Sequence, residues 1–370
     1  MKKILILTNS INGFYSFRNE LIEELLKSKY EVIISSPYDS KSDYYMSKGI
    51  NVINTIIYRH GKNPFNDLKL LFYYRGIIRK FKPIVILTYT IKPNIYGGLA
   101  ARITKTPYLT NITGLGTAVE NKGLLQFITL RLYKVALKRA DTIFFQNKEN
   151  MDFMLEKGIK GKKQRLLPGS GVNVEHFNYI EYPKDGVLHF LFIGRIMKAK
   201  GVDYYLKAAK YIKSKYPNTM FHILGGYEED YKTIINEYDK RGYIKYHDRV
   251  DDVREFHKIA HVIIHPTYYP EGMSNVLLEG ASSGRPLIAT NRSGCKEIIE
   301  HGQNGYLFDI HNQLDLNKKI EDFINLSYQD KKNMGISGRE KVKKDFDRKF
   351  VIDSYLNEIF SLGDSKLKSL

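Results

Sequence analysis

The feature of this sequence that most constrains its fold is a regular alternation of short apolar runs with longer amphipathic segments. Residues 4–8, 31–36 and 84–88 are compact runs rich in β-branched side chains, which is typical of buried strands. An amphipathic segment at 17–29 separates the first two runs, and the alternation continues to residue 157. Strands that alternate with helices form βαβ units, and such units build parallel sheets. The first half is therefore predicted to be a doubly wound, Rossmann-like α/β domain.

The alternation stops near residue 166 and begins again at residue 188. The stretches 166–173 and 182–186 carry Pro and Gly residues that interrupt regular structure. The second half opens like the first, and we expect it to include a helix near 296–301 and to finish with two helices. We predict two Rossmann-like domains that face a cleft: an N-terminal domain over 1–168, a linker over 169–186, a C-terminal domain over 187–345, and a terminal helix over 346–370 that packs back toward the N-terminal domain.

Residues 270–280, P-E-G-M-S-N-V-L-L-E-G, carry the strongest local sign of a ligand site. The apolar run at 261–266 predicts a strand, and residues 275–283 predict a short helix with Ser274 or Asn275 as its N-cap. The free backbone N–H groups at a helix start favour the binding of phosphate. The main-chain groups expected to meet a ligand there belong to Gly272, Met273, Ser274, Asn275 and Val276.

Two carboxylates flank this predicted helix start. Glu279 lies about one turn inside the helix, roughly 6 Å from its start, where a carboxylate can accept from both hydroxyls of a cis-diol. Glu271 precedes the helix and is expected to face whatever group is attached beyond the phosphates. Two Glu residues at this spacing also occur by chance, since most Glu side chains are simply solvated. The arrangement favours a nucleotide-sugar, with its ribose on Glu279, its diphosphate at the helix start and its sugar near Glu271.

Two further glycine-containing loops are expected at the same edge of the second sheet. The loop G-R-I-M-K-A-K-G at 194–201 follows the first strand of the second half, and its two basic residues could hold a diphosphate. The pair G-G at 225–226 follows the next strand. In a Lys-rich chain such basic residues are often only solvated, but three loops at one edge point to one site. The residues assigned to these loops are Gly194, Arg195, Lys200, Gly225 and Gly226.

Composition limits the class of protein and its partners. The chain has 370 residues, a formal net charge of +18 and a single cysteine, Cys295. One cysteine excludes an internal disulfide framework and a cysteine-based zinc site, and it fits a reducing compartment. No stretch approaches the about 18 apolar residues of a membrane span, and the first apolar run is too short for a signal peptide, so a cytoplasmic protein is expected. The positive charge implies affinity for polyanions: nucleic acid, an anionic membrane surface or phosphorylated substrates.

Other short motifs give no reason to expect a cofactor. The glycine runs at 114–119 and 169–174 lack the third glycine of a dinucleotide fingerprint, and no P-loop is present. The D-F-D at 345–347 resembles a metal-binding D-x-D motif but lies among basic residues. We therefore expect no metal and no resident cofactor.

Together these motifs resemble the retaining GT-B glycosyltransferases of family 4, most strongly from about Leu188 to Phe308. The resemblance rests on Glu271 and Glu279, on the loop 194–201 and on the residues Gly294, Glu297, Gly302, Asn304 and Gly305. The first half resembles the subgroup that makes bacterial capsule, O-antigen or protein-linked glycans. Its matching segments are T-I-K-P-N-I-Y-G at 90–97, N-I-T-G-L-G at 111–116 and F-F-Q-N at 144–147.

The resemblance implies transfer of a sugar from a nucleotide donor, usually a UDP-sugar, with retained anomeric configuration and without a metal. Arg195 and Lys200 would stabilise the departing diphosphate, Glu279 would hold the ribose, and Glu271 would bind the hydroxyls of the donor sugar. Gly13, expected in a loop after the first strand, would face the donor from the N-terminal domain. The implied acceptor is a saccharide on a polyprenyl diphosphate at the inner face of the cell membrane, and the oligomeric state stays undetermined.

The chain departs from the family in one place. Many relatives carry a His in the first-domain loop after the fifth strand, where this chain has Thr113, so the catalytic contribution of that domain is open. The polar candidates on the acceptor side, each an acceptor contact or a structural residue, are Arg18, Lys92, Asn94, Thr113 and Glu120.

Two alternative functions are compatible with part of this pattern. A nucleotide-sugar 2-epimerase would share the fold and the donor but would need no acceptor. A nucleic-acid-binding protein would explain the charge, but it should show basic residues interleaved with aromatic ones along one face, and not glycine-lined loops. The spacing of the motifs favours the transferase and no nucleic-acid partner.

The predicted helix 124–140 carries two neighbouring stripes at helical spacing. One stripe is apolar and is expected to face the core; it consists of Leu124, Ile128, Leu132 and Val135. The other is basic with one aromatic residue, and we expect it to rest on an anionic membrane surface as a peripheral contact; it consists of Phe127, Arg131, Lys134 and Lys138.

Overall fold

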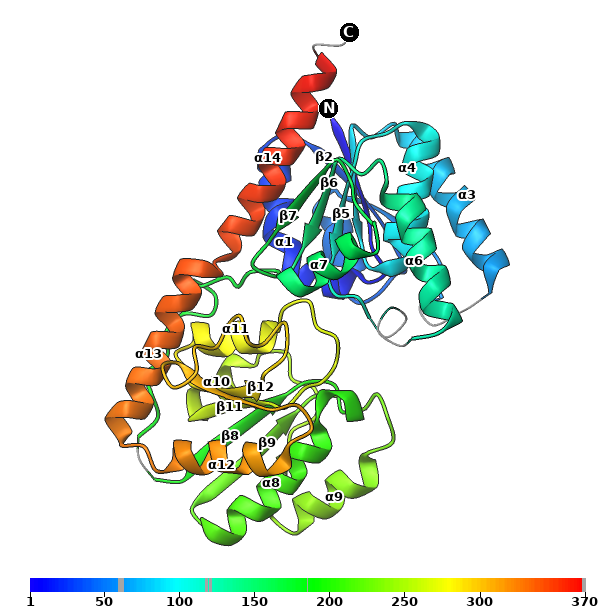
Figure 1. The fold of residues 1–370 in the computed structure, drawn as a ribbon. Coiled ribbons are helices and arrows are strands. Elements are labelled where there is room, and N and C mark those ends of the chain that lie inside the picture. The colour runs from blue at the N-terminus through cyan, green and yellow to red at the C-terminus, as the bar shows by residue number, and fades with distance from the viewer. Residues whose placement is uncertain (59–62, 117–118, 120–121, 185, 368–370) are drawn as a thin grey trace. The chain divides into compact units, whose positions relative to one another are not determined.

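The computed structural model describes residues 1–58, 63–116, 119, 122–184 and 186–367 of the chain (Figure 1). These residues form two compact units. The first unit contains Met1–Ser170, Pro270–Met273 and Lys349–Leu370, and the second contains Gly171–Tyr269 and Ser274–Arg348. The segment predicted as a linker therefore belongs to the second unit from Gly171 onward.

The first unit is built on a parallel sheet of seven strands in the order β3-β2-β1-β4-β5-β6-β7. Parallel pairing puts Leu5 opposite both Ile33 and Ile86 in the middle of the sheet. The strands are β1 (Lys3–Leu7), β2 (Glu31–Ser36), β3 (Asn51–Asn54), β4 (Val85–Tyr89), β5 (Tyr108–Ile112), β6 (Thr142–Phe145) and β7 (Lys163–Leu166). The helices are α1 (Ile11–Lys27), α2 (Ser42–Ser47), α3 (Pro64–Phe81), the π-helix η1 (Pro93–Gly97), α4 (Gly98–Thr104), α6 (Leu124–Leu137), α7 (Lys148–Glu156) and α14 (Arg348–Leu367).

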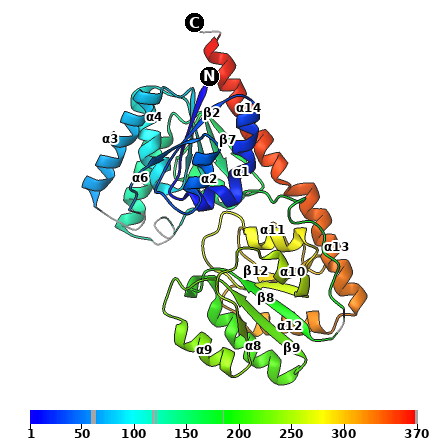
Figure 2. The same cartoon turned by 180° about the vertical axis from the view of Figure 1, so that it is seen from behind.

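Both faces of this sheet are covered, because successive side chains of a strand point to opposite faces. On β1, Leu5 and Leu7 join a core cluster with residues of α3, α4 and α6. Ile4 and Ile6 join a second cluster with residues of α1 and α14 (Figures 1 and 2). The inner strands of the sheet are therefore buried on both faces, which is the usual environment of parallel strands, while the edge strands β3 and β7 are partly exposed.

The C-terminal helix α14 packs on the second of these faces. The hydroxyl of Tyr355 accepts a 2.6 Å hydrogen bond from Asn111 Nδ2. The buried carboxylate of Glu358 accepts from Thr142 Oγ1 at 2.8 Å and pairs with Arg165 Nε at 2.6 Å. These polar contacts to β5, β6 and β7 fix the register of the helix on the first unit.

The second unit is built on a parallel sheet of six strands in the order β10-β9-β8-β11-β12-β13. Both sheets therefore have a doubly wound arrangement, as predicted, in which the strand order reverses in the middle. The strands are β8 (Leu188–Ile193), β9 (Thr219–Leu224), β10 (Lys245–Tyr246), β11 (Val262–His265), β12 (Leu287–Thr290) and β13 (Gly305–Phe308). The helices are η2 (Lys198–Lys200), α8 (Val202–Lys215), α9 (Lys232–Lys240), α10 (Arg254–Ile259), α11 (Asn275–Ser282), α12 (Gln313–Ile324) and α13 (Tyr328–Asp345).

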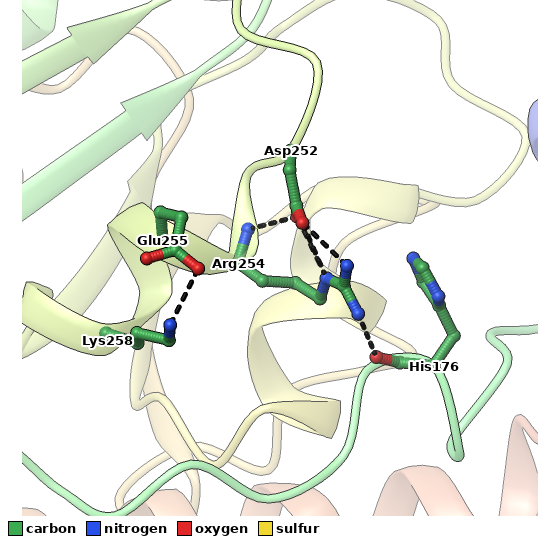
Figure 3. A network of polar contacts seen from close by, with 5 residues as sticks. All are labelled: His176, Asp252, Arg254, Glu255 and Lys258. Atoms are coloured by element: carbon green, nitrogen blue, oxygen red, sulfur yellow. Dashed lines mark hydrogen bonds and ion pairs between the residues drawn. The ribbon is translucent and has the colours of Figure 1, made fainter.

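An arginine at the start of α10 binds the segment around His176, near the beginning of the second unit (Figure 3). Arg254 donates through Nε and Nη2 to the Asp252 carboxylate at 2.9 and 2.6 Å, and its Nη1 donates to the carbonyl of His176 at 3.3 Å. This charged hydrogen bond lowers the pKa of Asp252 to about 2. One turn on, Lys258 pairs with Glu255 at 2.6 Å. The network ties the segment that follows Gly171 to α10.

A row of histidines crosses one part of the second sheet. His222 on β9 bonds through Nε2 to His189 Nδ1 at 2.8 Å and through Nδ1 to His247 Nε2 at 2.9 Å. His261 accepts at Nδ1 from the backbone N–H of His189. Burial lowers the pKa of His222 to about 3 and that of His261 to about 4, so these rings are neutral at pH 7. A chain of neutral imidazoles can alternate donor and acceptor nitrogens, and it therefore satisfies the polar atoms inside the sheet.

Three expectations about elements are wrong. Residues 296–301 do not form a helix: 296–298 are in turns, where the N–H of Ile298 donates to the carbonyl of Cys295 three residues back, and His301 forms a β-bridge with Gly305. After β13, the described residues form three helices instead of the expected two. Helix α1 starts at Ile11, six residues earlier than predicted, because the Ser10 hydroxyl caps it by accepting from Gly13 N–H at 3.1 Å.

Candidate active site

Two loops of the second unit leave the sheet where its strand order reverses. β8 lies between β9 and β11, so the loops after β8 and β11 start side by side at the carboxyl edge. In open α/β sheets, ligands bind at this switch point. The loop after β8 carries Arg195 and Lys200, and the loop after β11 leads into α11. The two strongest sequence motifs are therefore neighbours in the fold.

Glycine is required where the loop after β8 contacts the loops that follow β9 and β11. Gly201 has φ +78° and a Cβ there would lie 2.0 Å from the carbonyl oxygen of Pro266. Gly225 has φ +139° and a Cβ there would lie 1.8 Å from the carbonyl oxygen of Gly194. Any side chain at either position would force the loops apart. A Cβ at Gly226 would meet the Arg249 side chain, which can move.

Arg195 and Lys200 converge on one aromatic ring, that of Tyr269. The Arg195 guanidinium lies 5.3 Å from the ring centroid and the Lys200 ammonium lies 5.1 Å from it. Arg195 also forms a 3.4 Å ion pair with Glu228. Tyr269 was not singled out from the sequence, although it stands directly before the motif at 270–280. Both positive charges therefore lie beside one ring, directly before the loop that leads to α11.

The loop that carries Lys200 is fixed to the chain after β11. The N–H of Tyr268 donates to the carbonyl of Ala199 at 2.9 Å, and the Thr267 hydroxyl donates to the same carbonyl at 3.4 Å. Burial, followed by the positive charge of Lys200, holds the pKa of His265 well below its ordinary value. A neutral His265 therefore lies near Lys200 at the end of β11.

The start of α11 is capped from inside the second unit. Ser274 is the N-cap, and its hydroxyl accepts from Leu277 N–H at 3.4 Å. The Ser274 N–H donates to the carbonyl of Gly294 at 2.8 Å, so this group is not free for a phosphate, contrary to the expectation. Asn275 and Val276 supply the N–H groups of the first turn. Gly294 is held in place because its own N–H donates to Glu297 Oε2 at 2.7 Å.

Glu279 lies one turn into α11 and is partly buried. Loss of hydration raises the pKa of its carboxyl group to about 7, and the charge of Arg348 acts in the opposite direction. Arg348 is buried at the start of α14 and donates from Nη2 to the carbonyl of Gly171 at 3.3 Å. No sequence pattern links Arg348 to Glu279, because the two residues are far apart in the chain.

The loop Pro270–Met273 belongs to the first unit. Asn147 Nδ2 donates to the carbonyls of Gly272 at 2.5 Å and Glu271 at 3.3 Å. A Cβ at Gly272 would lie 2.2 Å from the carbonyl oxygen of Thr113. Packing on the first unit therefore accounts for the glycine at 272. Asn147 had no role in the sequence interpretation, although it ends the matching segment at 144–147.

Other predicted residues of the first unit have contacts within the protein. Arg18 is buried and donates from Nη1 to the carbonyl of Phe17 at 2.7 Å. Lys92 forms a 2.6 Å ion pair with Asp67, and buried Asn94 donates from Nδ2 to the carbonyl of Asn111 at 2.9 Å. Glu120 lies outside the described residues. Gly13 lies in the first turn of α1 and not in a loop.

The predicted core-facing stripe of α6 is wrong. Leu124, Ile128 and Val135 are exposed, and of the four residues only Leu132 packs against the core. The buried residues of this helix are Thr129, Tyr133, Ala136 and Leu137. Apolar residues occupy most positions of α6, so periodicity could not distinguish the buried side. The basic stripe is exposed as expected, with the Arg131 guanidinium 5.0 Å from the ring centroid of Phe127.

Within the described ranges, no group of three or more His, Cys, Asp or Glu side chains could hold a metal ion. None of the helices in the described part of the chain is both long and apolar enough to cross a bilayer.

Known proteins resemble this chain along most of its length. The sequence profile of "Glycosyl transferases group 1" matches residues 180–341, and that of "Glycosyl transferase 4-like" matches residues 3–147. An uncharacterized glycosyltransferase of Haemophilus influenzae is 30% identical over 339 residues, which cover 88% of this chain and 91% of the relative. The chain belongs to the family 4 glycosyltransferases of the GT-B fold.

A second relative and one solved structure are also similar to this glycosyltransferase. A protein of Campylobacter jejuni is 28% identical over 335 residues, covering 86% of this chain and 88% of the relative. It is named N,N'-diacetylbacillosaminyl-diphospho-undecaprenol alpha-1,3-N-acetylgalactosaminyltransferase. The structure of Anabaena HepE in complex with UDP is 15% identical, with a TM-score of 0.79, and covers 98% of this glycosyltransferase and 100% of HepE. At that identity the similarity supports the fold alone.

Proposed function

We propose that this glycosyltransferase moves a sugar from a UDP-sugar to a polyprenyl-diphosphate-linked saccharide in bacterial surface-polysaccharide or glycan assembly. The transfer retains the anomeric configuration and needs no metal. The bond between the anomeric carbon and the diphosphate breaks, and a bond to an acceptor hydroxyl forms. UDP leaves, and the proton of the hydroxyl is released.

The convergence of Arg195 and Lys200 on Tyr269 is the observation that carries this proposal. A diphosphate gains negative charge as the glycosidic bond breaks, and preorganised positive groups stabilise that charge. Both cations come from the loop after β8, whose Ala199 carbonyl accepts hydrogen bonds from Tyr268 and Thr267 in the loop after β11. Two fixed cations can therefore take the part that a divalent metal plays in other transferases.

The remaining donor contacts follow from α11 and from two glycines. In the proposal, the N–H groups of Asn275 and Val276 meet phosphate, Glu279 accepts from the ribose hydroxyls, and Glu271 binds the donor sugar. A Cβ at Gly13 or at Gly194 would make only ordinary contacts, at 3.6 and 3.7 Å. The packing of the protein itself therefore does not demand glycine at these positions, which supports close approach of a ligand as the reason for it.

The acceptor class follows from the Campylobacter relative, whose name specifies a saccharide on diphospho-undecaprenol. Such an acceptor resides in a membrane, so we propose that the enzyme works as a peripheral protein at the inner face of the cell membrane. The exposed stripe of Phe127, Arg131, Lys134 and Lys138 on α6 supports this position, since each basic residue near an anionic leaflet contributes about 1 kcal/mol.

Mass spectrometry of products formed from a panel of UDP-sugars and a bacterial lipid extract tests the proposal. We expect the mass of a lipid-linked saccharide to increase by one sugar residue, with UDP released only when the extract is present. Isomerisation of the donor without an acceptor would instead support the 2-epimerase. Excess EDTA should leave the activity unchanged, and a loss that Mg²⁺ or Mn²⁺ restores would overturn the metal-free transfer.

A further inference from the structure

The outer face of α3 is apolar where a surface helix is normally polar. Residues at helical spacing point away from the core, and Phe65 and Phe72 are 75% and 54% exposed. Leu68 is exposed on the same face, and Tyr73 is exposed to one side of it, with its hydroxyl donating to the carbonyl of Asn54 at 3.2 Å. The opposite face is apolar as well and packs into the core through Leu70, Tyr74, Ile77 and Ile78. Core packing therefore explains only one of the two apolar faces of α3.

The first half of α6 has the same property. Leu124 and Phe127 are 74% and 57% exposed, and Leu125 and Ile128 are exposed beside them. The residues of α6 that its own core requires lie further along, at Thr129, Tyr133, Ala136 and Leu137. Exposed side chains of this size, gathered on one helix, are typical of an interaction surface and not of scattered surface residues.

These two helices lie on the same face of the first unit. α4 packs against both α3 and α6, and all three cover one side of the sheet (Figures 1 and 2). α3 follows β3 and α6 follows β5 in a parallel sheet, so both helices begin at its carboxyl edge. Most of the exposed apolar residues are in the first half of each helix and therefore gather toward that edge, whereas Tyr73 and Val135 lie further along.

Basic residues accompany the apolar ones along both helices. Those exposed on or directly after α3 are Lys69, Arg79, Lys80 and Lys82, and those exposed on or directly after α6 are Arg131, Lys134, Lys138 and Arg139. α6 contains no acidic residue, and Asp67 on α3 is paired with Lys92 at 2.6 Å. The face combines apolar side chains that can enter a bilayer with positive charges that complement anionic headgroups.

We propose that the outer faces of α3 and α6 form one lipid-docking surface, which inserts Phe65, Leu68 and Phe72 of α3 and Leu124 and Phe127 of α6 into an anionic bilayer. This deepens the proposed membrane position, in which the basic stripe of α6 alone would give a purely electrostatic attachment. Apolar insertion adds binding that salt does not screen. Vesicle binding needs neither donor nor acceptor. The docking surface can therefore be disproved while sugar transfer is confirmed, and sugar transfer can be disproved while vesicle binding is confirmed.

The absence of tryptophan from the chain permits a direct test of insertion. A Phe65→Trp variant of the full chain should show a blue-shifted emission on mixing with vesicles of phosphatidylglycerol and phosphatidylethanolamine, and brominated lipids should quench it. The matched control is Leu314→Trp, at a residue of α12 in the second unit that is 80% exposed. Its emission should not change. Equal spectra for the Phe65 probe with and without vesicles would overturn the proposal.

Co-sedimentation with the same vesicles separates insertion from charge. Phe65→Ser with Phe72→Ser should weaken binding about tenfold or more at both 0.1 and 0.5 M salt, because each apolar side chain contributes separately from charge. Leu314→Ser should bind like the wild type. Because the substituted residues are exposed, the variants should melt at the same temperature as the wild type. An unchanged melting temperature excludes misfolding as the cause of weaker vesicle binding. If the double variant binds vesicles normally but loses concentration-dependent self-association seen without lipid, the surface is an interface between copies of the chain and the proposal is wrong.

Discussion

Glu279 should make the affinity for UDP depend on pH, because its pKa of about 7 lies within the working range. Ribose hydroxyls donate to a carboxylate, so the ionised form is the form that binds. For one such group, the apparent affinity should fall about fivefold between pH 7 and pH 6 and rise at most about twofold from pH 7 to pH 8. The phosphate of UDP also titrates in this pH range. Glu279→Gln retains the pH dependence that comes from the phosphate and should lose the part that comes from the carboxylate.

The same carboxyl group should act on stability in the opposite direction. Folding raises its pKa from 4.5 to about 7, so the folded state favours the neutral form. The empty protein therefore loses stability as pH rises from about 4.5 to about 7, by up to about 3 kcal/mol in total. Glu279→Gln cannot ionise, so at pH 8 it should melt at a higher temperature than the wild type while binding UDP more weakly.

Calorimetric titration of UDP at pH 6, 7 and 8, together with thermal melting of the empty proteins, measures both effects. Arg348→Met should raise the pKa of Glu279 further and move the midpoint of the affinity profile to higher pH, since it removes the charge that favours ionisation. Identical pH profiles for the wild type and Glu279→Gln would refute the assignment of this carboxylate to the ribose.

Three further outcomes are expected. Arg195→Ala or Lys200→Ala should each lose about 2–4 kcal/mol of transition-state stabilisation, measured as a slower rate in single-turnover assays. A rate within a few-fold of the wild type would show that the substituted residue has no catalytic role. Gly225→Ala should lower the melting temperature of the empty protein, because its Cβ would lie 1.8 Å from a carbonyl oxygen, whereas a similar change at Gly226 should be milder. Because the pKa of His222 is lowered to about 3 by burial, stability should fall as pH drops below about 6.5, and His222→Phe should melt with a shallower pH dependence between pH 6.5 and pH 4.

The course of the chain and the main motifs could be predicted from the sequence because the signals for them are local. Alternating apolar runs specify buried parallel strands, and glycine, proline and capping residues mark where helices start and stop. The loop after β8 and the helix start at Ser274 were found in this way. The start of α1 was predicted wrongly, because the Ser10 hydroxyl caps the helix six residues before the amphipathic pattern becomes clear.

Tertiary structure alone decided which of several equivalent local patterns is used. Helix α6 is apolar on most sides, and only packing selected Tyr133 and Leu137 for the core and left Leu124 and Ile128 exposed. The Ser274 N–H is taken by Gly294, and the charge beside Glu279 comes from Arg348. These contacts join residues distant in sequence, and the free energy that selects them comes from burial and hydrogen bonding in the folded chain. Local periodicity carries no information about either.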